Sequence, residues 1–248
     1  MKKIFYIVCF ACFVSCNLQD TADCFESSGE VIKQEFTVER FNTIMVNRDI
    51  ALFLKQGQKH KVEVQTGNNL LDNIDVNVVG GKLILTNNNT CNYTRAVGVT
   101  KIFVTAPNIT EIRSSTQYDI SSRGVLTYPS LTVLSEDFFE EDAFTVGDFR
   151  LKINSDSFRV VFNNLSHCYV SGRTKKLDVH LASGDGRFEG ANLKAKHVFI
   201  NHRGTNDIIV NPQESLRGLV SSYGNVISKN KPAVVSVDLV FKGFVVFN

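Results

Sequence analysis

The sequence predicts an all-β protein whose mature part forms a single elongated domain of the β-solenoid type. Apolar and polar residues alternate with a period of two through most of the chain after residue 33, and no stretch there has a helical period. From about residue 110 the segments become short and similar features recur 20 residues apart. A period near 20 without helices is typical of a solenoid, in which each coil stacks on the previous one.

Five early segments show the alternation that half-buried strands require. A Gly80-Gly81 pair lies between the third and fourth segments, and it predicts a tight turn that joins two strands. The five segments are residues 50–54, 62–65, 76–78, 83–85 and 102–104.

The later segments define the repeat. Leu131–Ser135 and Leu151–Ser155 share a template at a spacing of 20, and Gly184, Gly204 and Gly224 each lie near the end of an expected strand. These strands are residues 177–181, 198–200 and 216–220. The spacing predicts four inward residues on successive coils, which are Val133, Ile153, Val179 and Phe199. The alternative to a solenoid is an antiparallel sandwich.

The N-terminus has the order of a secretory signal. Lys2 and Lys3 precede an apolar run from Ile4 to Val14, and the small residue Ser15 follows. The run is too short to span a bilayer as a mature helix, although an uncleaved anchor is the alternative. We therefore expect residues 1–15 to be a signal peptide.

The ending Phe13-Val-Ser-Cys16 resembles the lipobox of bacterial lipoproteins. The resemblance implies cleavage before Cys16 and a diacylglycerol on its thiol. It also implies a partner, the membrane, and a place in the outer membrane or at the cell surface, with the periplasmic face as the alternative.

Residues 16–33 are polar and have no strong period, so we expect a flexible tether that precedes a domain at residues 34–248. Asp20 and Asp23 resemble the surface-export signal of some Gram-negative lipoproteins, whereas an ordinary solvated linker is an equal alternative. The segment Asp20-Thr-Ala22 resembles the acceptor of a periplasmic O-glycosylation system, which implies a glycan on Thr21.

Composition excludes one class of partner. Of 27 Lys and Arg residues, Lys2 and Lys3 leave with the signal, so 25 basic residues balance 25 acidic ones. A neutral mature chain lacks the basic footprint of a nucleic-acid-binding protein. Trp is absent, so any sugar stacking must use Tyr or Phe.

Three cysteines remain in addition to Cys16 after the signal is removed. They are Cys24, Cys91 and Cys168, an odd count that allows one disulfide at most. Their wide spacing matches no metal motif. Burial as small apolar residues is the default expectation.

A succession of segments carries a family resemblance. The segments are Arg40–Val46, Leu54–Gly57, Val62–Val64, Asn69–Ile74 and Gly81–Leu85, and later Gly190–Leu193, Leu216–Ile227 and Pro232. Over roughly residues 34–235 the chain resembles the "putative auto-transporter adhesin, head GIN domain" family. The resemblance implies a right-handed parallel β-solenoid, similar to pectin lyases but without the lyase catalytic residues, and a role in adhesion. The chain departs from the family in its corners, where only Ser183–Gly186 is close to Gly-Ser-Gly.

The densest acidic run is Glu136–Asp142. Carboxylates of this kind bind Ca²⁺ in pectate lyases, but strand alternation would send Glu136 and Asp137 to opposite faces. We expect a solvated corner loop.

The histidines, which are His60, His167, His180, His197 and His202, match no metal or acid–base motif. The sequence thus predicts no metal site, no cofactor and no catalytic residue.

One group of cations on adjacent coils is a candidate patch for acidic polysaccharide, or else a set of solubilising charges. The group is Arg173, Lys175, Lys176, Lys194 and Lys196.

We conclude that the sequence indicates a lipid-anchored, non-enzymatic envelope protein that binds an unknown extracellular glycan or protein. The alternatives are a polysaccharide lyase or hydrolase on the same fold, and a structural protein.

Overall fold

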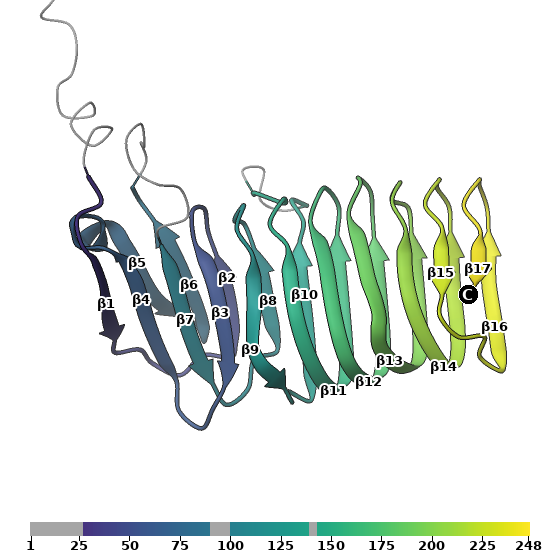
Figure 1. The fold of residues 1–248 in the computed structure, drawn as a ribbon, viewed down its shortest axis with the longest axis horizontal. Helices are drawn as coiled ribbons and strands as arrows, with labels where there is room; N and C mark the ends of the chain where they lie inside the picture. Colours follow the sequence, from purple (N-terminus) through teal and green to yellow (C-terminus); the bar gives the residue numbers. More distant parts are fainter. Residues whose placement is uncertain (1–26, 90–99, 139–142) are drawn as a thin grey trace, which may run out of the picture.

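Two rows of parallel strands run along the molecule and enclose one hydrophobic core (Figure 1). The computed structural model describes residues 27–89, 100–138 and 143–248. All 17 strands belong to one hydrogen-bonded sheet, because the longest strands bend and pass from one row to the other. The protein is therefore all-β, as predicted, and its continuous core makes it a single domain.

The early elements are β1 (Val31–Phe36), β2 (Thr43–Val46), β3 (Ala51–Gln56), β4 (Lys61–Gly67), a 3₁₀ helix η1 (Asn68–Asn73), β5 (Ile74–Val79), β6 (Lys82–Asn87), β7 (Lys101–Ala106), β8 (Glu111–Ser114) and β9 (Ile120–Leu126). The later ones are β10 (Ser130–Ser135), β11 (Phe149–Phe162), β12 (His167–Leu181), β13 (Arg187–His202), β14 (Ile208–Val220), β15 (Val226–Ser228), β16 (Val234–Leu239) and β17 (Val245–Phe247).

The N-terminal end of each row is closed by antiparallel strands. β5 and β6 form a hairpin through Gly80 and Gly81, which both have positive φ, as the predicted tight turn requires. β4 pairs antiparallel with β7 on one side and with β1 on the other. These antiparallel pairings lie next to the first parallel strands of both rows.

All other pairings are parallel. The first row runs β7–β3–β9–β11–β12–β13–β14–β15–β17, and the second runs β6–β2–β8–β10–β11–β12–β13–β14–β16. The first halves of β11–β14 lie in the first row and their second halves in the second row. A bend near Ser155 and Thr174 therefore turns each long strand from one row into the other.

Inward side chains stack in columns along the rows of strands. One column contains Phe149, Cys168, Phe188, Ile208 and Val226, which follow each other in register and are fully buried. The polar neighbours of these residues face outward, so the alternation seen in the sequence separates core from surface. The predicted strands are confirmed at every segment that the sequence analysis identified.

The predicted 20-residue spacing of glycines is confirmed at one corner. The Thr205 N–H donates to the Gly184 carbonyl at 2.9 Å, and the Gly224 N–H donates to the Gly204 carbonyl at 3.2 Å. A Cβ on Gly224 would lie 2.2 Å from the Asn206 carbonyl oxygen. Glycine is therefore required there by the close approach of successive corners.

The predicted register is wrong in two places. Val160, not Ile153, lies between Val133 and Val179 in the second row, because β10 pairs with the second half of β11. Phe199 is 46% exposed, while its neighbour Ile200 is fully buried and pairs with Val179. Val133, Ile153 and Val179 are buried as predicted.

The expected flexible tether ends earlier than predicted. β1 begins at Val31 and is held antiparallel to β4, and Lys33 pairs with Glu63 at 3.0 Å. The Asn69 Nδ2 group also donates to the Ser27 carbonyl at 2.9 Å. Residues 27–33 therefore belong to the folded domain, whereas residues 16–26 lie outside the described part. No helix within the described ranges is long and apolar enough to cross a membrane.

A candidate basic groove

The predicted basic residues gather around a hollow at the bend between the two rows. Arg173, Lys175, Lys194 and Lys196 line this hollow, which has a volume of about 480 Å³. Lys176 is exposed but does not line it. The other lining residues are Thr127, Pro129, Asn154, Ser155, Asp156, Thr174 and Gln213. Four of the five cations in the predicted patch thus belong to one site.

Strand register places the four cations in two neighbouring pairs on β12 and β13. Arg173 of β12 pairs directly with Lys194 of β13, and neighbouring strands are about 4.8 Å apart. Lys175 and Lys196 lie two residues further along the same strands, just beyond the bend near Thr174, and both are exposed. The cluster therefore follows from parallel pairing at an offset of 21 residues.

Carboxylates balance only one of these two pairs. The Lys175 ammonium lies 2.7 Å from Asp156, and the Lys196 ammonium lies 3.2 Å from Glu214. Within residues 27–89, 100–138 and 143–248, Arg173 and Lys194 form no ion pair. An adjacent arginine and lysine thus carry positive charge that the described part of the protein leaves uncompensated.

The hollow continues along the outside of the first row. A middle hollow of about 280 Å³ shares Asn154 and Arg173 with the basic one. A third hollow of about 500 Å³ shares Lys152 and Ser171 with the middle one. We call the three hollows together the basic groove.

An aromatic ring and an arginine lie at the far end of the basic groove. The Arg150 guanidinium is 4.3 Å from the centre of the Tyr169 ring and bonds to Asp119 and Asp148 at 2.6 and 3.1 Å. The hydrogen bond to Asp119 raises the pKa of Arg150. Ser121, Ser122, Ser171 and Asn192 add hydroxyl and amide groups. The sequence analysis did not identify this end, because its residues come from four separate strands.

The sequence predicts that the acidic run Glu136–Asp142 is a solvated loop. This prediction is wrong for its first residue, Glu136, which is buried. Glu136 is 4% exposed and forms an ion pair with Arg113 of β8. Its second carboxylate oxygen accepts a hydrogen bond from the Phe138 N–H at 2.7 Å. Asp137 is exposed, as expected, and residues 139–142 lie outside the described part. Glu136 is therefore a structural residue.

The histidines lie apart from one another. His180 pairs with Asp178 at 2.7 Å and His197 with Glu214 at 3.4 Å, both on the outer surface. His202 is fully buried, so it faces away from the exposed His197. In the part of the chain that the structure describes, no three His, Cys, Asp or Glu residues could hold a metal ion together.

Cys168 is free and fully buried in an inward column, and burial raises the pKa of its thiol. The expectation of a small apolar role is confirmed for this residue. Cys24 and Cys91 lie outside the described residues, as do the predicted lipidation site Cys16 and the predicted glycosylation site Thr21.

A family model described as "putative auto-transporter adhesin, head GIN domain" matches residues 40–232. The chain belongs to this family. The head GIN match covers the strands from β2 to β15 and the whole basic groove. The resemblance that the sequence indicated is therefore confirmed, and its extent agrees with the predicted range of roughly 34–235.

Crystal structures of similar proteins share the fold of this head GIN domain protein. One is a "putative adhesin" from Bacteroides fragilis, 21% identical, with a TM-score of 0.79 over 90% of this chain and 100% of that chain. Another is a "putative lipid binding protein" from Parabacteroides distasonis, 15% identical, with a TM-score of 0.61 over 88% and 97% of the two chains. A "putative adhesin" from the same species is 17% identical, with a TM-score of 0.59 over 90% and 99%. No curated protein matches the chain.

Proposed function

We propose that this protein is a lipid-anchored, non-enzymatic binding protein of the outer membrane or cell surface, built on a right-handed parallel β-solenoid. The parallel pairing of successive coils supports the solenoid, and the family description as an adhesin supports surface binding. The basic groove is the observation that carries the proposal, because it is an open surface that crosses several strands and is lined by a cluster of cations.

The chemistry of the basic groove favours binding over hydrolysis. Glycosidases need two carboxyl groups about 5–9.5 Å apart on either side of the scissile bond. The lining acids of the groove are Asp156, held by Lys175 at 2.7 Å, and Glu189, held by Arg187 at 2.5 Å. They lie in different hollows, and each is neutralised by its own cation. A lyase or hydrolase is the alternative function.

A binding array of glycans and matrix proteins, probed with the purified full-length protein, tests this proposal. We expect retention on a defined set of ligands without release of oligosaccharides into solution. Release of products, lost when Asp156 and Glu189 are changed to Asn and Gln, would replace the binding role with the enzymatic alternative. Absence of any retained ligand would contradict the binding role itself.

The anchor is tested separately in the native host. The Cys16→Ala protein should lose lipid labelling and leave the membrane fraction, because the thiol that accepts the lipid is absent. Continued labelling, or retention in membranes after a carbonate wash, would contradict the lipoprotein assignment. The handedness of the coils is tested by an experimental structure.

A further inference from the structure

We propose that the basic groove binds an acidic polysaccharide, with Arg173 and Lys194 as the pair that contacts its carboxylate or sulfate groups. This proposal rests on the binding function above and names its ligand class. It starts from the direct pairing of these two cations on neighbouring strands.

Like charges opposite each other on neighbouring strands destabilise a sheet. The protein compensates such charges elsewhere in the same cluster, where Asp156 lies 2.7 Å from Lys175 and Glu214 lies 3.2 Å from Lys196. It does not compensate Arg173 and Lys194 in this way anywhere in the described ranges. An anion between them would supply the missing negative charge.

The lining of the basic hollow suits sugars better than lipid chains. Pro129 is the one apolar residue among the eleven that line it. Asn154 and Gln213 offer amide groups, which can exchange hydrogen bonds with sugar hydroxyls. Arginine adds a planar fork of donors that matches a carboxylate or sulfate.

The length of the groove favours a polymer over a single anion. The three hollows share residues in sequence, so one path leads from Lys194 past Lys152 to Arg150. Tyr169 lies at the end of this path with Arg150 against its ring at 4.3 Å. An extended chain with repeating negative charges would meet a cation in each hollow.

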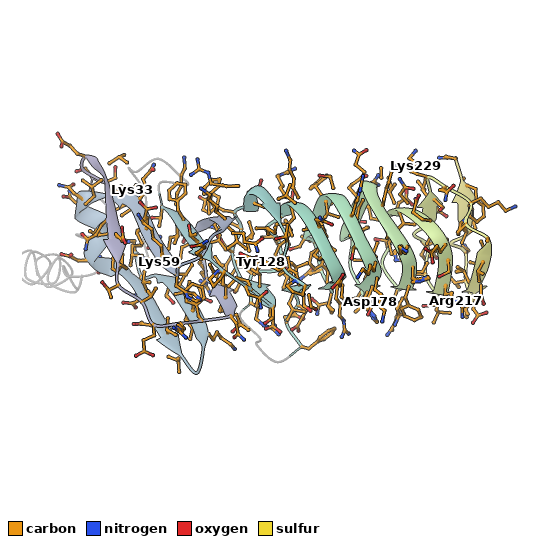
Figure 2. The ribbon with its side chains drawn as sticks, turned by 90° about the horizontal axis from the view of Figure 1, so that it is seen from below. Lys33, Lys59, Tyr128, Asp178, Arg217 and Lys229 are labelled. Atoms are coloured by element: carbon orange, nitrogen blue, oxygen red, sulfur yellow. The ribbon has the colours of Figure 1, made fainter. Side chains whose placement is uncertain are left out.

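Binding of the full-length protein to polygalacturonate and dextran sulfate, with neutral dextran as the reference, tests this inference. We expect Arg173→Gln with Lys194→Gln to weaken binding of the acidic polymers at least tenfold. The matched control is Lys59→Gln with Lys229→Gln, which removes the same charge at two exposed lysines outside the groove (Figure 2). We expect this control to bind within about twofold of the wild type. All four changes are at exposed side chains, and melting curves check that each variant folds.

The outcomes separate the two proposals. Binding of neutral glycans that the Arg173 and Lys194 changes do not weaken would overturn the ligand class while leaving the binding function intact. Equal weakening by both double variants would show a diffuse charge effect and overturn the site. Tighter binding to phosphatidylglycerol vesicles than to either acidic polymer, lost in the groove variant, would assign the groove to a membrane surface instead. Failure of the wild type to bind either acidic polymer would also overturn the inference.

Discussion

At the scale of single residues, stability depends on which face of a strand a side chain occupies. Ile200 is fully buried opposite Val179, while Phe199 beside it is 46% exposed against His180. Sequence alternation alone allows two choices of face, and the large apolar Phe199 favours the wrong one. The inward set becomes unambiguous only when the paired strands are known.

Ile200→Asp should lower the free energy of unfolding by at least about 3 kcal/mol, because it buries an unpaired charge and leaves a cavity. Phe199→Asp is the matched control, and we expect it to cost less than about 1 kcal/mol, since the new carboxylate reaches solvent. Urea unfolding measures both variants. Similar losses for the two would contradict the register described here.

The Arg113–Glu136 pair gives a second prediction at this scale. Glu136→Ala leaves the largely buried Arg113 without its partner, which should cost about 3–5 kcal/mol. Asp137→Ala, next to it on the exposed side, should change stability by less than about 0.5 kcal/mol. Thermal melting of the two variants compares them directly. If Glu136→Ala melts like the wild type, the pair does not stabilise the corner.

His202 links stability to pH. Burial lowers its pKa to about 4, against a weaker opposing effect of the Asn206 backbone and of the Asp207 carboxylate. The unfolded chain, with a histidine pKa near 6.5, binds the proton more readily. The free energy of unfolding should therefore fall as pH drops from about 6.5 toward 4, by up to about 1.4 kcal/mol per pH unit.

The check is the slope of stability against pH in the wild type and in His202→Leu, whatever the absolute stability of the variant. We expect the variant to lose the His202 contribution between about pH 6.5 and 4. Identical slopes for the two proteins would assign the pH dependence to other groups.

At the scale of elements, close contact between neighbouring coils sets the backbone requirements. Gly172 of β12 has φ +118°, and a Cβ there would lie 1.9 Å from the Ile153 carbonyl oxygen on β11. Gly124 of β9 has φ +103°, but a Cβ there would meet no atom within 4 Å. Gly124 and Gly172 therefore both require a backbone conformation with positive φ. Only Gly172 also lies against a neighbouring strand.

Gly124→Ala should cost about 1–3 kcal/mol from backbone strain. Gly172→Ala should cost about 1–3 kcal/mol more, because the new methyl group forces the two strands apart. Differential scanning calorimetry of both variants tests the contact. Equal losses would show that backbone conformation alone requires glycine at position 172.

The strands could be predicted from the sequence because the alternation of apolar and polar residues depends only on which side chains are buried. The corner at Gly184, Gly204 and Gly224 could be predicted because the spacing of these glycines is constant. The pairing of β10 was not predictable from Leu131–Ser135 and Leu151–Ser155. These segments share a template, but Leu131 pairs with Phe158, beyond the bend in β11. A bend without a glycine or proline leaves no clear mark in the sequence.

At the scale of the whole molecule, the two ends of the stack differ. Antiparallel strands cover the N-terminal end, while β16 and β17 leave apolar residues exposed at the other. The segment between β16 and β17 adds Phe241 and Phe244, which are 54% and 52% exposed. Lys242 lies over Phe241 and Tyr223 at 5.9 and 5.2 Å.

The basic groove illustrates what sequence reasoning can reach for a site. Arg173, Lys175, Lys194 and Lys196 were predictable as a patch because two neighbouring coils carry them at one spacing. Their hollow, and its continuation to Arg150 and Tyr169, depend on register shifts within β12 and β13 that composition does not encode. The lack of an ion pair at Arg173 and Lys194 within the described ranges likewise required the folded structure.

Lysine footprinting of the full-length protein with polygalacturonate tests the central claim, that the basic groove is the binding surface. Acetylation rates of individual lysines, read by mass spectrometry, report which side chains the polymer covers. We expect Lys194, Lys196 and Lys152 to be protected, and Lys59 and Lys229 to react at unchanged rates. Protection at Lys229 and Lys242 with none at Lys194 would place binding at the C-terminal coil and contradict the account.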